Sequence, residues 1–255
     1  MIEAFHLRAT ARGMTLFEDL TLVFDEGEAW IVSGPPTCGK TLLLRILSGD
    51  RRPDSGDVVA CGDSLYGGDS AARDRFRLMT AIVPESLPAS GQTAGDLFRL
   101  SALSAGDISP GERDRREVEL LALLGVAGTS TVPLSRLSVS ERARVALAAE
   151  LLRGPKVLLL DMLLSNAGRD WTDSLLGLFR ALAREGRTIV MMERELPDRW
   201  RGAAEPGTAV ASDPRIREAG PFRMFRLAGA SAPQRVPTAG IPTEEGPGEE
   251  GGEPP

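Results

Sequence analysis

The sequence predicts a layered α/β fold in which helices cover a largely parallel sheet. Two short apolar runs, residues 157–160 and 188–192, are typical of strands that are buried on both faces. A glycine-rich segment lies between a third apolar run, residues 30–32, and the helix-like residues 42–47. Strands that alternate with helices in this way form a sheet with helices on its faces.

The glycine-rich segment follows the pattern G-x-x-x-x-G-K-[ST]. Glycine lets such a loop turn its backbone N–H groups inward, and the positive end of the next helix adds to the attraction for phosphate. Lys40 is expected to reach the β- and γ-phosphates of a nucleotide, and the Thr41 hydroxyl is expected to bind Mg²⁺. The sequence therefore predicts a nucleoside triphosphate site, whose contact residues are Gly34, Pro35, Pro36, Thr37, Cys38, Gly39, Lys40, Thr41 and Leu42.

Further elements are predicted on both sides of this loop. Residues 20–24 alternate as a half-buried strand, residues 58–59 indicate another strand, and residues 78–83 indicate a third. From about residue 93 to residue 154 the pattern becomes helical, with one apolar face formed by Val118, Leu120, Leu121 and Leu124. Ser138 is expected to open a second helix, which Gly154 ends. These residues form a helical insert.

The composition indicates one domain and a tail. The chain has 255 residues, enough for the core of one α/β domain, which is expected at residues 1–229. Residues 230–255 are mainly Pro, Gly and Glu, so a disordered acidic tail is expected there. A net charge of -6 and a pI of about 5.1 argue against a nucleic-acid partner. Because no uncharged apolar stretch approaches the roughly 18 residues of a membrane span, and no signal peptide is recognisable, a cytoplasmic location is expected.

The chain has two cysteines, Cys38 and Cys61, and both are predicted to be free thiols because no disulfide or zinc pattern is present. Cys38 has two interpretations. At a helix N-terminus its thiolate would be stabilised, which would make it a redox-sensitive thiol that nucleotide covers. The simpler interpretation, a small residue that fills the loop, is preferred.

Several segments follow the loop in a recognisable order. Residues 52–58 read Arg-Pro-Asp-Ser-Gly-Asp-Val, residues 137–142 read Leu-Ser-Val-Ser-Glu-Arg, and residues 157–161 read Val-Leu-Leu-Leu-Asp. Over about residues 2–194 the chain thus resembles an ATP-binding cassette (ABC) ATPase, with the second segment at the place of the signature L-S-G-G-Q-R and the third at the Walker B strand. The resemblance implies a P-loop NTPase of ABC type with a mixed sheet core and a helical subdomain insert. It also implies that Asp161 holds Mg²⁺ through water.

Four positions depart from the family pattern. The glutamate that follows the Walker B aspartate and polarises the attacking water is replaced by Met162, which can neither accept a proton nor orient water. Arg194 stands at the place of the family's histidine, and Gly168 at that of the D-loop aspartate. Glu85 replaces the glutamine that senses Mg²⁺, and it can still ligate a metal. The usual catalytic base is therefore absent from its place.

The signature is altered as well. Ser138 is kept, and in the family this serine contacts the γ-phosphate that the opposite subunit holds. Val139 and Ser140 add side chains where glycine lets backbone approach phosphate closely, so dimer closure should be weakened. Ser138 and Glu141 also fit a capping box, S-x-x-E, and this interpretation is equally open.

The resemblance implies a subunit that binds Mg-ATP, with Thr41, Asp161 and Glu85 as metal ligands, and hydrolyses it weakly or not at all. It implies a membrane permease as partner, a homo- or heterodimer of cassette subunits, and a peripheral place on the cytoplasmic face of the membrane. Two alternatives remain open. An active ATPase could use a relocated base, Glu85 or Glu193, because each follows a strand beside the phosphate site. A non-transport scaffold could use the cassette fold and the acidic tail to recruit proteins.

Removal of residues 230–255 is expected to leave the nucleotide affinity and the melting temperature nearly unchanged. The segment has too little apolar area to offset the entropy lost on ordering it. Calorimetry and thermal melts of the full and truncated chains measure the two quantities. A drop of several degrees in the melting temperature would show that the tail docks on the domain.

Overall fold

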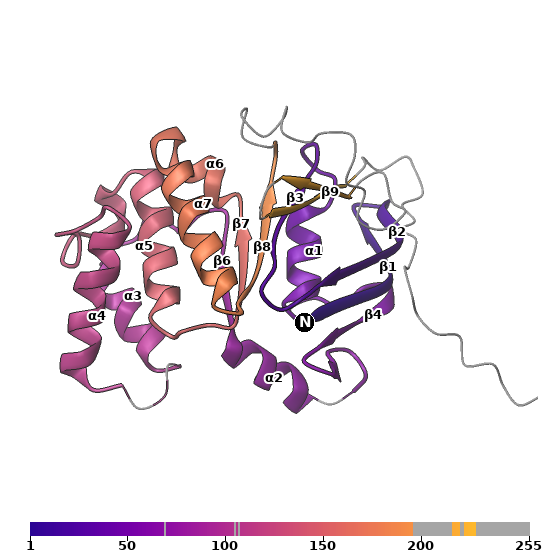
Figure 1. Cartoon of the computed structure of the whole chain (residues 1–255), viewed down its shortest axis with the longest axis horizontal. Helices are drawn as coiled ribbons and strands as arrows, with labels where there is room; N and C mark the ends of the chain where they lie inside the picture. The colour runs from indigo at the N-terminus through magenta and orange to yellow at the C-terminus, as the bar shows by residue number, and fades with distance from the viewer. Residues whose placement is uncertain (69, 105, 107, 196–215, 220–221, 228–255) are drawn as a thin grey trace, which may run out of the picture.

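The computed structural model describes residues 1–68, 70–104, 106, 108–195, 216–219 and 222–227. These residues form two sheets and a group of helices to one side of them (Figure 1). The predicted α/β fold is confirmed. The expected domain end at residue 229 and the expected tail, residues 230–255, lie outside the described residues.

The larger sheet has six strands in the order β6-β7-β8-β3-β10-β9. All neighbours pair in parallel except β10 and β9, which are antiparallel. The strands are β3 (Ala29–Ser33), β6 (Thr80–Val83), β7 (Val157–Asp161), β8 (Thr188–Glu193), β9 (Ile216–Ala219) and β10 (Phe222–Arg226). Every residue of β3, β7 and β8 is buried, as the apolar runs predicted. The carboxyl ends of these three strands meet at one edge, where ligands bind in open α/β sheets.

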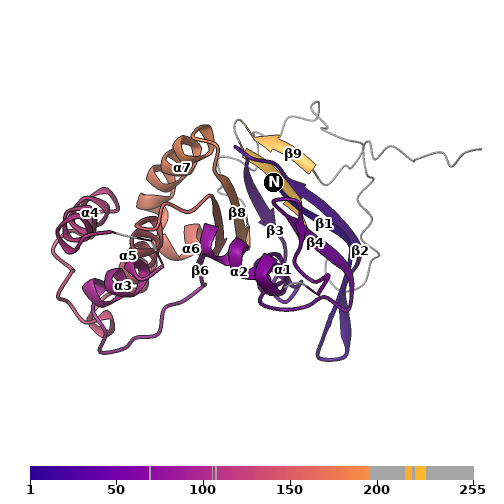
Figure 2. The same ribbon diagram turned by 90° about the horizontal axis from the view of Figure 1, so that it is seen from below.

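The smaller sheet is antiparallel, with the strand order β2-β1-β4-β5. Its strands are β1 (Ile2–Ala11), β2 (Met14–Phe24), β4 (Ser55–Ala60) and β5 (Asp63–Ser64). Helix α1 (Lys40–Leu47) lies between the two sheets (Figure 2). Its buried side chains share one apolar cluster with both sheets, including Leu43, Val58 and Val190. The helix that follows the phosphate loop is therefore held from two sides.

The other face of the larger sheet is covered by helices. Helices α5 (Val139–Leu151), α6 (Leu163–Ala167) and α7 (Arg169–Arg184) contact its strands, and α3 (Ala94–Ala102) and α4 (Pro110–Leu123) pack on α5, farther from the sheet (Figure 2). The short 3-10 turn η1 (Leu134–Arg136) comes before α5. The apolar side chains of these helices share a second cluster with the sheet, including Ile31, Leu158 and Ile189. Helices α3, α4 and α5 fall within the insert expected at residues 93–154 and lie together at the left of Figure 1.

Two local expectations were wrong. The strand expected from residue 78 begins at Thr80, because Leu78 and Met79 still belong to helix α2 (Ser70–Met79) and the Leu78 side chain is 62% exposed. On α4, Val118 was expected on the apolar face but is 67% exposed. The inner face of this helix instead carries Glu117, whose carboxylate accepts a hydrogen bond from Ser130. A polar residue that finds a partner thus takes an inward position that hydrophobic spacing assigns to an apolar one.

Gly125→Ala is expected to lower the free energy of unfolding by about 2–4 kcal/mol. Gly125 has a φ of 63°, and an added Cβ would lie 2.0 Å from the ring of Trp171. Gly128→Ala is the matched control, since Gly128 has a φ of 79° but nothing within 4 Å of an added Cβ. This control isolates the backbone cost, about 1–2 kcal/mol. Equal losses in urea unfolding would show that contact with Trp171 contributes nothing.

Candidate nucleotide-binding site

The glycine-rich loop joins the end of β3 to the start of α1, at the carboxyl edge of the larger sheet (Figure 1). Thr37 and Gly39 have left-handed backbone conformations, with φ of 65° and 97°. A Cβ on Gly39 would lie 3.2 Å from the Leu16 side chain and 3.3 Å from the ring of Phe17. The loop needs glycine at this position because β2 presses against it and because the backbone is left-handed.

The Lys40 side chain folds back over the loop. It is 7% exposed, and its Nζ donates to the carbonyls of Gly34 and Pro35 at 2.7 and 2.9 Å. An ammonium group has three donors and a compact charge, so phosphate oxygens that enter the loop can replace these neutral acceptors with charged ones. The side chain is thus already placed inside the phosphate loop.

Thr41 and Asp161 form the part of the site that suits a cation. The Thr41 hydroxyl donates to Oδ2 of Asp161 at 2.8 Å, and so connects α1 to the end of β7. Asp161 is 3% exposed, and its Oδ1 is buried without a hydrogen-bond partner among the described residues. Burial raises the pKa of Asp161. An unpaired buried carboxylate oxygen beside a hydroxyl fits Mg²⁺, which prefers hard oxygen ligands.

The described residues do not supply a complete metal cage. No group of three or more His, Cys, Asp or Glu residues in the described part of the chain could hold a metal ion. Phosphate oxygens and water would therefore have to complete the coordination of an ion at Thr41 and Asp161. This is how Mg²⁺ is usually held in nucleotide sites, where it keeps several waters.

Met162 follows Asp161 directly and turns the chain from β7 into α6. It is 4% exposed, its φ is 55°, and its backbone N–H donates to the carbonyl of Met192 at 2.8 Å. A thioether has no proton to exchange and accepts hydrogen bonds weakly. The position next to the cation site therefore carries no group that can act as a base.

Glu193, one of the two candidate bases, is bound to the protein through both carboxylate oxygens. It ends β8 and is 1% exposed. Oε1 accepts from the backbone N–H of Leu164 at 2.7 Å, and Oε2 accepts from the Ser165 hydroxyl at 2.7 Å and its N–H at 3.3 Å. Burial raises the pKa of Glu193 to about 7, although the three donors act in the opposite direction.

Glu85, the other candidate base and a candidate metal ligand, lies after β6 on the surface. Its Oε1 is 3.4 Å from Nη2 of Arg194, and the two side chains are 49% and 62% exposed. Its charge contributes to the raised pKa of Asp161, after burial, which is the larger cause. The structure thus brings Glu85 near the cation site and pairs it with the arginine that stands in the histidine position.

Ser138 begins α5 in a capping box. Its hydroxyl accepts from the Glu141 N–H at 3.2 Å and donates to the Glu141 carboxylate at 2.7 Å. Hydrogen bonds from Ser138 hold the pKa of Glu141 below its usual value. The predicted capping box of these two residues is confirmed. Any further role of Ser138 toward a phosphate would require its hydroxyl to leave this arrangement.

The other signature residues have different surroundings. Val139 is 52% exposed. The Ser140 hydroxyl donates to the carbonyl of Ala167 at 2.5 Å, so it connects the start of α5 to the end of α6. A glycine at this place could not make that bond. Ser140 therefore attaches the signature turn to the end of α6.

Cys38 and Cys61 are both free thiols, as expected. Cys38 is 1% exposed, and its Sγ lies 3.6 Å from Nζ of Lys40. A Cβ on Gly34 would come within 2.7 Å of this sulfur, so the thiol fills the space that glycine leaves. These contacts are those of a small residue that packs inside the loop.

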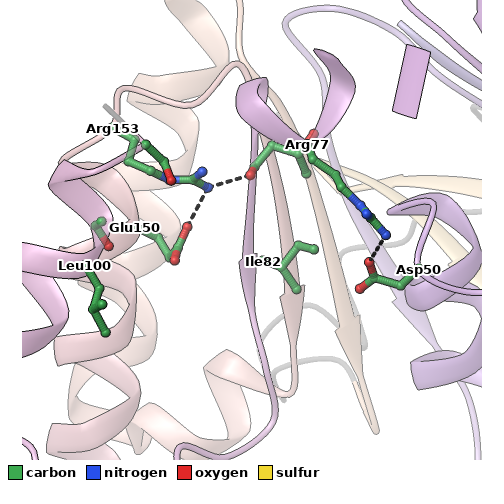
Figure 3. A pocket seen from close by; sticks show the side chains of 9 residues that line it. Asp50, Arg77, Ile82, Leu100, Glu150 and Arg153 are labelled. Carbon is green, nitrogen blue, oxygen red and sulfur yellow. Dashed lines mark hydrogen bonds and ion pairs between the residues drawn. The ribbon is translucent and has the colours of Figure 1, made fainter. Parts of the chain in front are cut away.

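A separate pocket of about 360 Å³ lies between the sheet side of the molecule and the helical insert (Figure 3). Arg77 pairs with Asp50 on one side at 2.8 Å, and Arg153 pairs with Glu150 on the other at 2.7 Å. Leu100 of α3 also lines the pocket and is 52% exposed. None of the phosphate-loop residues lines this pocket. It is therefore a second recess, with charged walls and an apolar side.

Comparison with known proteins identifies the family. A model of the family described as ABC transporter matches residues 17–163, more than half of the chain. The chain therefore belongs to the ABC transporter family. The match takes in the phosphate loop, the signature region and the strand that ends at Asp161.

Related proteins carry names from import systems. The methionine import ATP-binding protein MetN 2 of Pseudomonas entomophila is 30% identical over 192 residues, which are 74% of this chain and 57% of that protein. The spermidine/putrescine import ATP-binding protein PotA of Rubrobacter xylanophilus is 37% identical over 151 residues, which are 58% of this chain and 38% of that protein. The chain thus spans less than two thirds of the length of these relatives.

Solved structures show the same fold. The dimeric structure of MJ0796, described as a bacterial ABC transporter cassette, gives a TM-score of 0.69 at 22% identity and covers 76% of this chain and 88% of its own. A dimeric post-hydrolysis state of the same cassette bound to ADP and Pi gives a TM-score of 0.69 at 21% identity. The predicted ABC-type fold is confirmed. Within the described residues, no helix combines the length and apolar character needed to cross a bilayer.

Several residues that shape the site were not predicted from the sequence. The Asn166 amide donates to the carbonyl of Glu85, although 81 residues separate them. The Leu227 N–H donates to the Ser33 carbonyl at 2.7 Å, and the Leu227 carbonyl would lie 2.8 Å from a Cβ on Gly34. No local pattern signals such contacts because they depend on how distant strands meet.

Lys40→Ala is expected to weaken Mg-ATP binding by at least a factor of ten, about 1.4 kcal/mol, because a charge-assisted contact to phosphate is lost. Isothermal titration calorimetry measures the affinity. Lys156→Ala is the matched control, since Lys156 is the other lysine of the chain and is exposed. Equal affinities of wild type and Lys40→Ala would contradict the assignment of the site.

Proposed function

We propose that this chain is the nucleotide-binding subunit of an ABC transporter, that it binds Mg-ATP, and that it hydrolyses ATP weakly or not at all. In this proposal it acts with a membrane permease, as a peripheral subunit on the cytoplasmic face, and pairs with a second cassette subunit. One observation carries the proposal. The phosphate loop with Lys40 and the Thr41–Asp161 pair are intact, whereas Met162 stands where the family has its catalytic base. The names of MetN and PotA, both import ATP-binding proteins, support the transport role.

The binding part of the mechanism uses residues that are already in place. Lys40 and the backbone N–H groups of the loop would hold the β- and γ-phosphates. The Thr41 hydroxyl and the unpaired oxygen of Asp161 would hold Mg²⁺, directly or through water. The ion, when bound, neutralises charge on the phosphates. ATP is therefore retained by contacts that do not depend on the missing base.

The catalytic part is deficient. A positioned general base contributes about 10²–10⁴-fold to such reactions, and Met162 cannot supply it. Arg194 adds a positive charge in the histidine position, but its guanidinium pairs with Glu85, at 3.4 Å. ATP then acts mainly as a ligand that favours one conformation of the assembly over another.

Pairing of two subunits is supported by the dimeric form of the related cassette. In a pair, the signature of this chain would face the nucleotide of its partner. Ser138 is held by Glu141, Ser140 is held by Ala167, and Val139 projects into solvent. This signature therefore offers fewer hydrogen-bond donors to a phosphate than a glycine-rich signature does. A partner with an intact signature suits the chain better than a second copy of the chain.

The recess between the sheet side and the helical insert supports the permease role (Figure 3). A segment that enters it would contact the Arg77–Asp50 pair and the Glu150–Arg153 pair. The exposed side chain of Leu100 offers apolar contact at the same place. Such a mixture of apolar surface and charged rim is the usual composition of protein interfaces.

Met162→Glu alone is expected to raise ATP hydrolysis little, whereas Met162→Glu with Arg194→His, Val139→Gly and Ser140→Gly should exceed the sum of the separate effects. Groups that act as a unit recover function only together. Phosphate release in steady state, measured with the permease present, is the test. The same quadruple variant with glutamine in place of glutamate at residue 162 is the matched control, because it has the shape but not the base.

Robust turnover by the wild-type chain would contradict this proposal. If Glu85→Ala then abolished the turnover, or if Glu193→Ala abolished it while Mg-ATP binding and the conformational response to the nucleotide stayed intact, a relocated base would be established instead. If neither did, the chain would be an active ATPase with a base elsewhere. The permease requirement fails separately if the chain does not purify with the permease.

A further inference from the structure

Helix α6 begins two residues after Asp161, yet its own sequence provides no cap. Met162 is the N-cap residue and makes no side-chain hydrogen bond to the helix. The free N–H groups of Leu164 and Ser165 instead donate to the carboxylate of Glu193, which comes from the neighbouring strand β8. A negative charge at the start of a helix also interacts favourably with its dipole. Glu193 thus replaces the missing cap from a distant part of the chain.

We propose that Glu193 is a positioning residue that fixes α6 beside the nucleotide site. Helix α6 then transmits the binding of Mg-ATP at Asp161 to the signature turn and to the segment after β6. The inference deepens the proposed function and rests on it. Glu193 acts here through α6 and does not touch the nucleotide. It is therefore distinct from a catalytic base.

The geometry of Glu193 fits the role of a positioning residue better than that of a catalytic base. Both oxygens of Glu193 are occupied by donors of α6, and the residue is 1% exposed. A base must reach the proton of the attacking water at about 2.6–3.2 Å, directly or through one water. To do so, Glu193 would have to release the first turn of α6 and leave the buried N–H of Leu164 without a partner, which costs free energy.

The other end of α6 is connected to both parts of the chain that the proposal names. The Ala167 carbonyl accepts from the Ser140 hydroxyl of α5 at 2.5 Å, and the Asn166 amide donates to the carbonyl of Glu85. One short helix therefore contacts the carboxyl end of β8, the turn after β6 and the signature turn. A change at Asp161 that shifts α6 must alter these bonds, because a packed helix moves as a unit.

Trp171 is a natural reporter of this movement. It lies in the first turn of α7, where its backbone N–H donates to the Gly168 carbonyl at 3.1 Å. Its ring lies against the Arg144 guanidinium of α5, at 4.4 Å from the ring centroid. A shift of α6 and α7 relative to α5 would change this stacking and the fluorescence of the indole.

The test measures the change in tryptophan emission on adding Mg-ATP to the full chain, and assigns to Trp171 the part that is missing in Trp171→Phe. Calorimetry gives the Mg-ATP affinity of the same samples. We expect Glu193→Ala to keep the affinity within about threefold, because Glu193 does not touch the nucleotide, and to lose most of the Trp171 response. Glu193→Gln, which keeps one acceptor oxygen, should retain more of the response than Glu193→Ala.

Two further variants complete the test. Ser165→Ala removes one donor and leaves the carboxylate in place, so it should reduce the response partly, and it serves if Glu193→Ala does not fold. Glu185→Gln is the matched control, because Glu185 is at the far end of α7 with a side chain that is 60% exposed. Its response should equal that of the wild type.

The measurements distinguish failure of the proposed function from failure of this inference. Absence of Mg-ATP binding by the wild type would overturn the proposed function and this inference with it. Normal binding without a Trp171 response, or an unchanged response in Glu193→Ala and Ser165→Ala, would overturn only the inference. Loss of rapid hydrolysis in Glu193→Ala with the Trp171 response intact would overturn it in favour of a catalytic base.

Discussion

The hydrogen bond from Thr41 to Asp161 is the contact on which the arrangement of the site depends. It joins the first turn of α1 to the carboxyl end of β7, across 120 residues of sequence. Helix α1 is held between two sheets, and β7 is buried along its whole length, so neither end of this bond can move alone. Within the described residues, the bond leaves one oxygen of Asp161 without a protein donor. The same packing that fixes the phosphate loop thus creates the place where a cation fits.

Around Asp161, the carboxylates stand at other positions than in the family pattern. The position next to it holds the buried Met162, whereas the end of the adjacent strand β8 holds Glu193. A buried carboxylate is costly unless donors surround it, and Glu193 has three. The Glu193 carboxylate finds these donors at the start of α6. A carboxyl group is therefore kept near the cation site, but its two oxygens are used to hold a helix.

The sequence predicted what depends on neighbouring residues. The phosphate loop, the runs that became β7 and β8, and the capping box at Ser138 all come from short patterns, and the structure bears them out as local features. Contacts between distant segments were not accessible in this way. The buried role of Glu117 depends on where Ser130 lies, and that of Glu193 on the first turn of α6. From the sequence alone, Glu117 is expected on the surface and Glu193 is a candidate base, because neither pattern contains the partner that the tertiary fold supplies.

A nucleotide that is bound but hydrolysed slowly can act only through a difference in its affinity for two conformations. A complete switch from 1:99 to 99:1 requires a difference of about 10⁴-fold. In this chain the Ser138 and Ser140 hydroxyls are already bonded within the protein, so closure on a partner's phosphate, as proposed above, would gain little from them. Lys40 contributes equally in both conformations if the loop stays closed around the phosphates. In the proposed pair, the affinity difference would then come from the signature of the partner subunit and from the bonds of α6, which are contacts that a change of conformation can make or break.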